Sequence, residues 1–448
     1  MFEAFKSHKN NLLVIVMVVF GIIIGSGIEK GINAMPGKSY EDLSTFSDVL
    51  HLIQTDYVEE VEVKELVEGA IRGMLKTLDP HSSFLTPDMY KDMQVETSGS
   101  FGGLGLEVGM RDGVLTVISP IEDSPAYKVG VRAADKIIMI EEKSTKNLSL
   151  NEAVKLMRGK KGTPITITIM RESFEKPQDF TVIRDIIKLK SVKSEVVEEG
   201  IGYVRISSFM EKTGEDLGKK LDELKEGGNL TKGLILDLRN NPGGLLNQAV
   251  AVSEAFIDSG LIVYTGGRTK DQKSQFSAHE AGTYKGFPIV VLVNSGSASA
   301  SEIVAGALQD HKRALVLGER TFGKGSVQTI LKLNGGAALR LTTSKYYTPN
   351  GRSIQAKGIE PDILVKRIFN NGDNATDKDK DKKPHAIRES DLDRHFENPK
   401  KDEVDPEVVP VEEVKEEQPF RAGDNQLQRA RDILLSWNIF KNLETTEE

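Results

Sequence analysis

One local pattern occurs twice in the middle of the chain and limits the folds that this part can adopt. The first copy, residues 233–257, is an apolar run, a glycine-rich loop and a helix-like stretch. The second copy, residues 287–309, repeats this order around the turn Ser295-Gly296-Ser297-Ala298. Strand, loop and helix in this order are typical of parallel α/β units, whose loops meet at the carboxyl ends of the strands. The sequence therefore predicts an α/β domain, placed at residues 176–366, with an active site where these loops meet.

The first 38 residues are predicted to target the membrane. Lys6 and Lys9 precede an uncharged stretch from Leu12 to Ile28, and Glu29 follows it. About 17 apolar residues are near the lower limit for crossing a bilayer, and positive charge before them places the N-terminus in the cytoplasm. We expect an anchor in the inner membrane, with the rest of the chain on the periplasmic or extracytoplasmic side of the cell envelope.

A cleaved signal peptide is the alternative, because Gly25-Ser26-Gly27 supplies small residues for a cleavage site. A buried core helix is a third possibility, although the stretch has no polar face. In both membrane interpretations the working part of the protein is exported.

Charge and cysteine content exclude several functions. Lys and Arg number 59 against 67 Asp and Glu, a net charge of −8, so nucleic acid is not an expected partner. The chain has no cysteine, which removes disulfides, thiolate metal sites and a cysteine nucleophile. No sequence motif indicates a metal or another cofactor, and none is expected.

Two further regions precede the α/β domain. Residues 39–96 carry apolar residues at helical spacing and form a predicted N-terminal helical region that is interrupted at Pro80. His81 reads as a turn or packing residue there. Residues 97–175 contain short β runs separated by glycine and predict a β-rich module with two helices.

The opening of this module, Phe101-Gly102-Gly103-Leu104-Gly105-Leu106-Glu107-Val108, places glycines directly before a strand. Backbone N–H groups that converge in such a loop can bind a carboxylate. With Ser124-Pro125-Ala126 and the run from Gly130 to Ile137, the segment resembles a PDZ domain. The resemblance implies that a peptide C-terminus adds as a strand beside Leu106, with its carboxylate on Leu104, Gly105 and Leu106. Arg132 either senses an occupied groove or is a solvated surface arginine.

A serine at the start of the second helix of the α/β domain is in a position suited to a nucleophile, because free N–H groups there favour a developing oxyanion. Spacing alone leaves Ser295, Ser297, Ser299 and Ser301 open, and an ordinary helix N-cap is the alternative role.

A serine nucleophile needs a base. His311 lies twelve residues after Ser299, about 18 Å along one helix, and is too far away. His279 lies in a polar loop in which nothing positions it. Lys324, between Gly323 and Gly325, is the better choice if burial lowers its pKa, and a surface lysine is the competing interpretation.

Longer motifs resemble one family. Residues 294–303, 318–328, 237–244, 78–83 and 347–352 closely resemble the C-terminal processing peptidases, or tail-specific proteases. The resemblance implies a crotonase-like serine protease domain in which Ser299 is the nucleophile and Lys324 the general base. Gln328 would orient Lys324, and the oxyanion donors would be the N–H of Ala300 and that of Gly243 or Gly244.

The expected protein is an exported serine endopeptidase with a Ser-Lys dyad. Its PDZ domain would capture unstructured, apolar C-terminal tails of proteins for processing or degradation. A homo-oligomer and an adaptor protein are further expectations. The alternatives are a catalytically inactive scaffold that binds peptides and, less favoured, a crotonase-like acyl-transfer enzyme.

The end of the chain divides into two further segments. Residues 367–423 are rich in Lys, Asp and Glu and are predicted to be a disordered tether. Residues 424–448 form a predicted amphipathic helix, capped by Asp424, with Leu427, Arg431, Leu434 and Trp437 on one side. Its apolar face must dock on the protease, on another subunit or on a partner.

Overall fold

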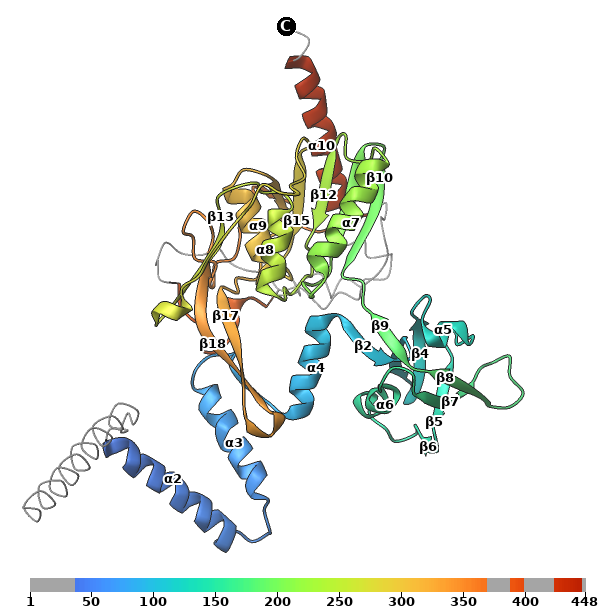
Figure 1. Ribbon diagram of the computed structural model, residues 1–448, viewed down its shortest axis with the longest axis vertical. Coiled ribbons are helices and arrows are strands. Elements are labelled where there is room, and N and C mark those ends of the chain that lie inside the picture. Colours follow the sequence, from blue (N-terminus) through green and yellow to red (C-terminus); the bar gives the residue numbers. More distant parts are fainter. Residues whose placement is uncertain (1–36, 369–386, 399–422, 445–448) are drawn as a thin grey trace, which may run out of the picture. The chain divides into compact units, whose positions relative to one another are not determined.

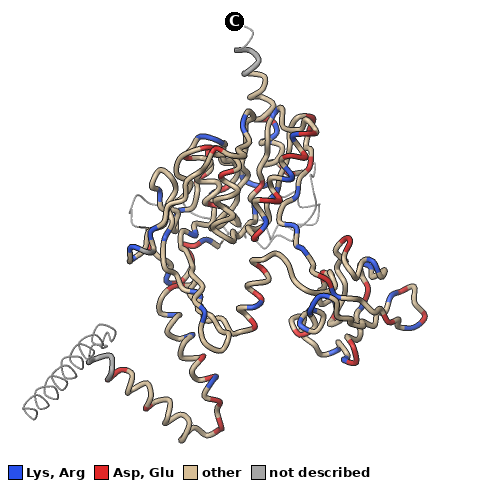
Figure 2. The backbone as a smooth tube through the Cα atoms, in the orientation of Figure 1, with Lys and Arg blue, Asp and Glu red and all other residues tan. Residues whose placement is uncertain are grey.

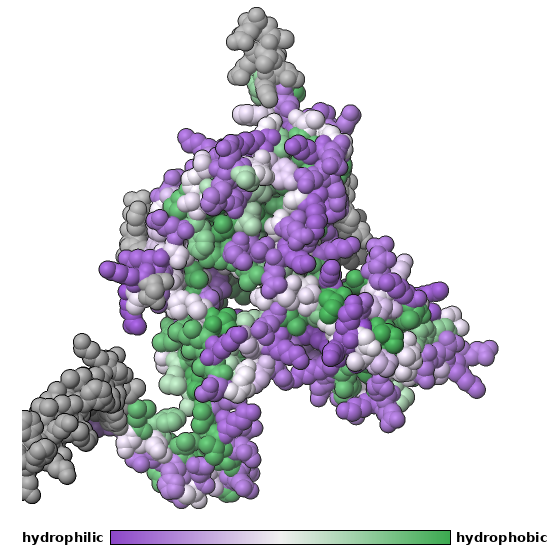
Figure 3. Space-filling view, viewed as in Figure 1, coloured by the Kyte–Doolittle hydropathy of each residue, from purple (hydrophilic) through white to green (hydrophobic). Residues whose placement is uncertain are grey.

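The computed structural model describes residues 37–368, 387–398 and 423–444, which form two compact units, up to Met74 and from Leu75 onward. In the first unit, α2 (Gly37–Asp56) and α3 (Val63–Lys76, whose last residues belong to the second unit) confirm the predicted helices. Apolar side chains of α2 are about half exposed, among them Leu43, Phe46, Val49 and Leu52 (Figure 3).

The predicted membrane segment Leu12–Ile28 lies outside the described residues. Among the helices that are described, none is both long and apolar enough to cross a bilayer.

The second unit begins with elements that pack with the predicted α/β domain. β1 (Ser83–Leu85) pairs with β18 (Ala338–Tyr347), and α4 (Pro87–Ser98) follows it. The hydroxyl of Thr86 caps α4 by accepting a hydrogen bond from the Met89 N–H at 3.3 Å. The region predicted as helical therefore also contributes one strand to a distant sheet.

The predicted PDZ module is a sheet with strand order β3-β4-β5-β7-β8, in which β6 pairs with β5. It has the two predicted helices. Its elements are β3 (Leu106–Arg111), β4 (Val114–Pro120), α5 (Pro125–Lys128), β5 (Lys136–Ile140), β6 (Lys143–Ser144), α6 (Leu150–Met157), β7 (Pro164–Met170) and β8 (Gln178–Ile183).

The predicted boundary of this module, residue 175, lies too early. Strand β8 pairs along its whole length with β7, so the module extends to Ile183. A single antiparallel pair, β2 (Ser100–Gly103) with β9 (Asp185–Lys188), holds the incoming and outgoing chain together.

A six-stranded sheet forms the centre of the predicted α/β domain. Its order is β10 (Val192–Glu198), β11 (Ile201–Ile206), β12 (Gly233–Asp237), β15 (Ile289–Val293), β16 (Leu315–Gly318) and β19 (Ile363–Leu364). All neighbouring strands are parallel except β10 and β11. The parallel α/β prediction is thereby confirmed, and β12 and β15 of its two copies are neighbours.

Helices cover both faces of this sheet because side chains alternate along each strand. On one face, Leu234, Leu236 and Val291 pack in the core with α7 (Thr213–Glu226), α8 (Leu246–Glu254) and α9 (Ala300–Asp310). On the other, Ile235 and Leu292 pack against α10 (Asn425–Glu444) (Figure 1).

A second sheet carries the segment after Lys324. In it, β18 pairs with β17 (Ser326–Lys332) and β13 (Leu261–Gly267), and β14 (Gln275–Ser277) forms its edge. Short 3₁₀ turns are η1 (Lys270–Gln272), η2 (Asn334–Gly336) and η3 (Glu389–Asp391). Acidic and basic residues are both spread over the described chain (Figure 2).

Part of the predicted disordered tether is ordered. Within residues 367–423, the segment 387–398 contains η3, and Glu389 is fully buried. Composition predicted disorder because charged residues rarely supply a core, whereas this carboxylate is satisfied by hydrogen bonds to residues far away in the sequence.

The C-terminal helix docks on the six-stranded sheet through Leu427, Ala430 and Leu434. Asp424 caps it, as predicted, by accepting from the Leu427 N–H at 3.1 Å. The predicted apolar side is only partly buried, because Trp437 is 59% exposed. The first turns of α10 therefore hold the helix in place.

Candidate active site

Ser299 lies between β15 and α9, where the two loops of the repeated pattern meet. Its backbone has φ 56° and ψ −112°, a conformation that non-glycine residues seldom adopt. The hydroxyls of Ser297 and Ser301 are buried and donate to the carbonyls of Leu238 and Asn241, each at 2.8 Å. These two serines hold the loops together, so Ser299 is the better placed nucleophile.

Glu302 links the predicted nucleophile to the predicted base. Its Oε2 accepts from the Ser299 N–H at 2.7 Å and from the Lys324 N–H at 3.0 Å. Its Oε1 accepts from the Thr321 hydroxyl at 2.6 Å and from the Gly323 N–H at 2.7 Å. Two segments, 299–302 and 321–324, therefore meet at one carboxylate.

The carboxylate of Glu302 is fully buried. Burial raises its pKa to about 7, and the four hydrogen bonds that it accepts oppose this rise. Sequence reasoning missed this residue. The signal was a glutamate three residues after a serine, at the start of an otherwise apolar helix.

Lys324 is presented by a tight loop before β17. Gly323 has φ 98°, and a Cβ on Gly325 would lie 2.5 Å from the Gln355 backbone N, so both positions need glycine as expected. Burial and then Arg340 lower the pKa of the Lys324 ammonium, while Glu389, Glu302 and Asp79 act in the opposite direction.

Tyr346 touches both predicted catalytic residues, and no sequence motif pointed to it. Its hydroxyl donates to the Lys324 carbonyl. Burial raises its pKa well above the usual value, whereas a hydrogen bond with the Ser299 side chain lowers it. Together with Glu302, this buried tyrosine brings Ser299 and the Lys324 loop into one site.

The two glycines left open by the sequence occupy different environments. A Cβ on Gly243 would lie 2.8 Å from the Ser299 Cβ and 2.9 Å from the Ala300 N. A Cβ on Gly244 would instead lie 2.2 Å from the Phe209 carbonyl oxygen. Gly243 therefore faces Ser299 and Ala300, and its N–H donates to Asn241 Oδ1 at 2.9 Å.

In the described part of the chain, no hydrogen bond joins Gln328 to Lys324. Its Nε2 donates to the hydroxyls of Ser326 at 3.0 Å and Thr342 at 3.2 Å. The register of β17 shifts between Val327 and Gln328, close to the bend that the predicted contact required.

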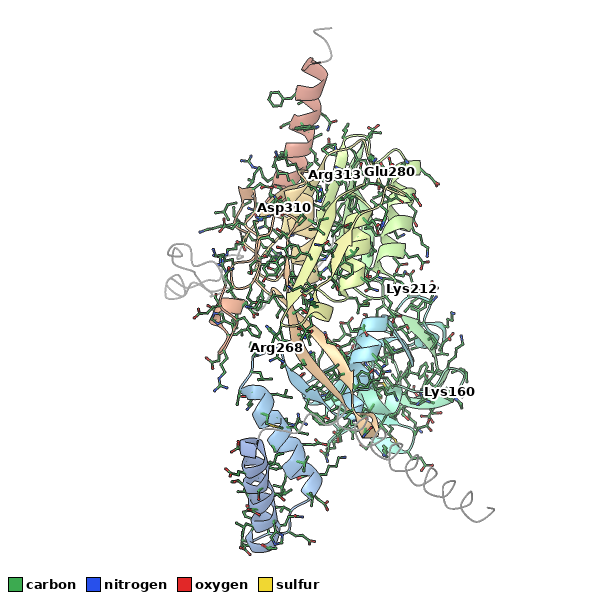
Figure 4. The ribbon with its side chains drawn as sticks, turned by 60° about the vertical axis from the view of Figure 1, so that its left-hand side comes forward. Lys160, Lys212, Arg268, Glu280, Asp310 and Arg313 are labelled. Atoms are coloured by element: carbon green, nitrogen blue, oxygen red, sulfur yellow. The ribbon has the colours of Figure 1, made fainter. Side chains whose placement is uncertain are left out.

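Neither histidine of the domain is close to these residues. His311, at the far end of α9, donates from its Nε2 to the Leu261 carbonyl at 2.7 Å. His279 is a surface residue that pairs with Glu254. Figure 4 labels Glu280, which follows His279 in the sequence, and Asp310 and Arg313, which are close to His311 in the sequence.

The predicted carboxylate-binding loop has the necessary backbone. The carbonyls of Leu104 and Gly105 accept from the Ala126 and Ile121 N–H groups, at 2.9 and 2.8 Å. In the described part of the chain, the N–H groups of Leu104 and Gly105 make no such backbone hydrogen bond. Strand β3, which begins at Leu106, is an edge of its sheet. The Arg132 side chain is exposed.

Family models match three parts of the chain. Peptidase family S41 matches residues 200–365, the PDZ domain residues 102–183, and the activating protease CtpB N-terminal domain residues 26–89. These matches cover the protease domain, the PDZ module and the N-terminal helices.

Relatives that match about three quarters of the chain agree with these matches. A carboxy-terminal-processing protease of Bartonella bacilliformis is 50% identical over 74% of this chain and 76% of its own. The carboxy-terminal processing protease CtpB of Bacillus subtilis is 37% identical over 77% and 75%. Among solved structures, a photosystem II D1 C-terminal processing protease is 30% identical over 72% of this chain and 92% of its own, with a TM-score of 0.43. The chain therefore belongs to the carboxy-terminal processing proteases of peptidase family S41, serine-type endopeptidases that carry a PDZ domain.

Proposed function

We propose that Ser299 and Lys324 form the catalytic dyad of this endopeptidase. The observation that carries the proposal is the single carboxylate of Glu302, which holds the N–H groups of both residues. Lys324 in its neutral form accepts the proton of the Ser299 hydroxyl as the oxygen attacks the peptide carbonyl. The lowered pKa of Lys324 allows this neutral form to be populated nearer to neutral pH.

The negative oxygen of the tetrahedral intermediate is stabilised by backbone N–H groups of Ala300 and Gly243. Ala300 follows Ser299 in the chain, and Gly243 lies next to both residues. Hydrogen-bond donors that are already in position before the reaction stabilise the negative charge of the transition state effectively. The Gly243 N–H must then be shared with, or released from, Asn241. Lys324 returns its proton to the leaving amine, and water subsequently cleaves the ester on Ser299.

The PDZ module delivers the substrate by its C-terminal tail. An unstructured tail adds as a strand to the free edge of β3, and its carboxylate binds the N–H groups of Leu104, Gly105 and Leu106. The side chain of Arg132 is exposed and could sense whether the groove is occupied. The proposed substrate tails are apolar, which suits binding by strand addition.

Amidation of the substrate C-terminus is expected to weaken binding about 10- to 150-fold, because hydrogen bonds to a charged group contribute roughly 1.5–3 kcal/mol. The measurement compares peptides that differ only at this end, by titration against the full chain carrying Ser299→Ala. A peptide with the same C-terminus free and an amidated internal side-chain carboxylate is the control. Equal affinity of free and amidated peptides would show that this loop does not receive tails.

The working part of the protein is exported and held at the inner membrane by the N-terminal segment. The support is the uncharged stretch Leu12–Ile28 after Lys6 and Lys9. Protease added to spheroplasts is expected to digest the chain beyond Ile28, with a cytoplasmic protein as the protected control. Digestion only after lysis would reverse the orientation. A chain released from the membrane and shortened near Gly27 would indicate a cleaved signal.

Self-association and an adaptor are further parts of the proposal. The support is the exposed apolar surface on α2 and that on the outer half of α10, where Trp437, Ile439 and Phe440 are exposed.

A further inference from the structure

The ordered segment 387–398 is fixed to the protease domain by contacts on several sides. The Asn398 side chain donates to the carbonyls of Ser353 at 3.2 Å and Gln355 at 2.8 Å. Lys345 lies over the Phe396 ring, 4.9 Å from its centroid. This segment follows the region matched by the peptidase family model, which ends at residue 365.

Glu389 is the buried centre of the segment. Its two carboxylate oxygens lie 2.9 and 2.8 Å from His81 Nε2, and Oε1 also accepts from Gln355 Nε2 at 2.8 Å. Both Glu389 and Gln355 are fully buried. Burying a carboxylate lowers the stability of the fold unless hydrogen bonds satisfy it. Glu389 therefore does not have the usual role of a charged residue, which is to keep an exposed surface soluble.

Both ends of the loop that carries Lys324 are tied to Glu389. At one end, the Glu389 N–H donates to the Phe322 carbonyl at 3.2 Å. At the other, the Gly325 N–H donates at 3.1 Å to the Gln355 oxygen, and the nitrogen of the same side chain donates to Glu389. Residues 322 and 325 flank the loop, whose two glycines give it little stiffness of its own.

We propose that Glu389 is a positioning residue for catalysis, which clamps the loop of Lys324 from outside the family's peptidase region. This inference rests on the proposed role of Lys324 as the base. Fixed placement of a reacting group is worth a large part of a catalytic rate, and misplacement by about 1 Å can cost 100-fold.

Glu389 also acts on Lys324 through its charge. The charged groups that face the Lys324 ammonium are Glu389, Glu302 and Asp79, which favour the protonated form, and Arg340, which opposes it. Neutralising Glu389 removes one of the three favourable charges. The pKa of Lys324 should then fall, and the neutral base should be populated at lower pH.

Two substitutions separate the clamp from the charge. Glu389→Gln keeps the size and an acceptor for Gln355, so the acid limb of kcat/KM should move to lower pH while kcat changes little. Glu389→Ala also removes the side-chain tie to Gln355, and through it to Gly325, while the backbone N–H of residue 389 still donates to Phe322, and kcat should fall about tenfold or more. Gln355→Met cuts the link to Gly325 but keeps the charge, so kcat should fall with the acid limb unmoved. Asp393→Asn, an exposed carboxylate of the same segment, is the matched control.

A second measurement does not depend on catalysis. In the full chain with Ser299→Ala, acylation of the Lys324 amine by acetic anhydride is followed by mass spectrometry across pH. Adding Glu389→Gln should move the half-maximal modification of Lys324 to lower pH, and adding Asp393→Asn should not. If Glu389→Gln shifts the labelling curve but leaves the pH profile of the active protein unchanged, the electrostatic link between Glu389 and Lys324 is supported. The same result rejects the proposed role of Lys324 as the base. An unmoved labelling curve, or kcat retained within about twofold in both Glu389→Ala and Gln355→Met, would overturn the inference.

Discussion

Ser299→Ala and Lys324→Ala are each expected to lower kcat for peptide cleavage by at least about 10⁴-fold. In the proposed dyad, the serine oxygen bonds to the substrate and the lysine takes the serine's proton, so neither residue would work without the other. Both variants should stay folded, because the Ser299 and Lys324 contacts with Glu302 use backbone N–H groups that alanine retains. The measurement is single-turnover cleavage of an unfolded protein with a free C-terminus.

Lys332→Ala is the matched control for charge, because Lys332 is exposed on the strand that follows the Lys324 loop. The kcat of Lys332→Ala for peptide cleavage should equal that of the unaltered chain. In the active protein, kcat/KM should rise with pH as Lys324 loses its proton, and burial should place this rise below the range of an ordinary lysine. Cleavage by Lys324→Ala at a near-normal rate would rule out the lysine base.

Glu302→Gln is expected to lower kcat by about 100-fold or more. The native carboxylate offers two oxygens, each of which accepts from two donors. An amide replaces one of these oxygens with a donor that faces two other donors, so one side of the junction between Ser299 and the Lys324 loop must open. The measurement is kcat on the substrate used for the dyad variants.

Glu360→Gln, at an exposed carboxylate of the same domain, is the control for the loss of one charge. Binding of tail peptides to the PDZ module should be unchanged in Glu302→Gln, since the substitution is confined to the protease site. A Glu302→Gln protein with normal kcat would show that the shared carboxylate does not organise the dyad.

The sequence predicted those parts of the fold that depend on local patterns of apolar residues and glycine. The strand, loop and helix order around β12 and β15 appears in the residues themselves, and so does the glycine-rich entry to the PDZ module. The requirement for glycine beside Lys324 was likewise visible as a sequence motif. The structure explains it, because Gly323 has a positive φ of 98° that other residues rarely adopt.

The remaining features depend on contacts between distant segments. Strand β8 belongs to the PDZ sheet because it pairs with β7, and its own residues fit either domain. Tyr346 reaches the site only because β18 lies beside β17. Glu389 is one acidic residue among many in a charged stretch, and only His81 and Gln355, far away in sequence, distinguish it. Periodicity and composition carry no information on such contacts.

The most direct test of the central claim is to trap the covalent intermediate on the nucleophile. The full chain is mixed with an activated peptide ester, quenched in acid within milliseconds and analysed by mass spectrometry of its peptides. The account predicts one acyl group on the peptide that contains Ser299, absent from Ser299→Ala and strongly reduced in Lys324→Ala. Turnover of the ester with the acyl group on another residue, or with Ser299 never acylated, would contradict it.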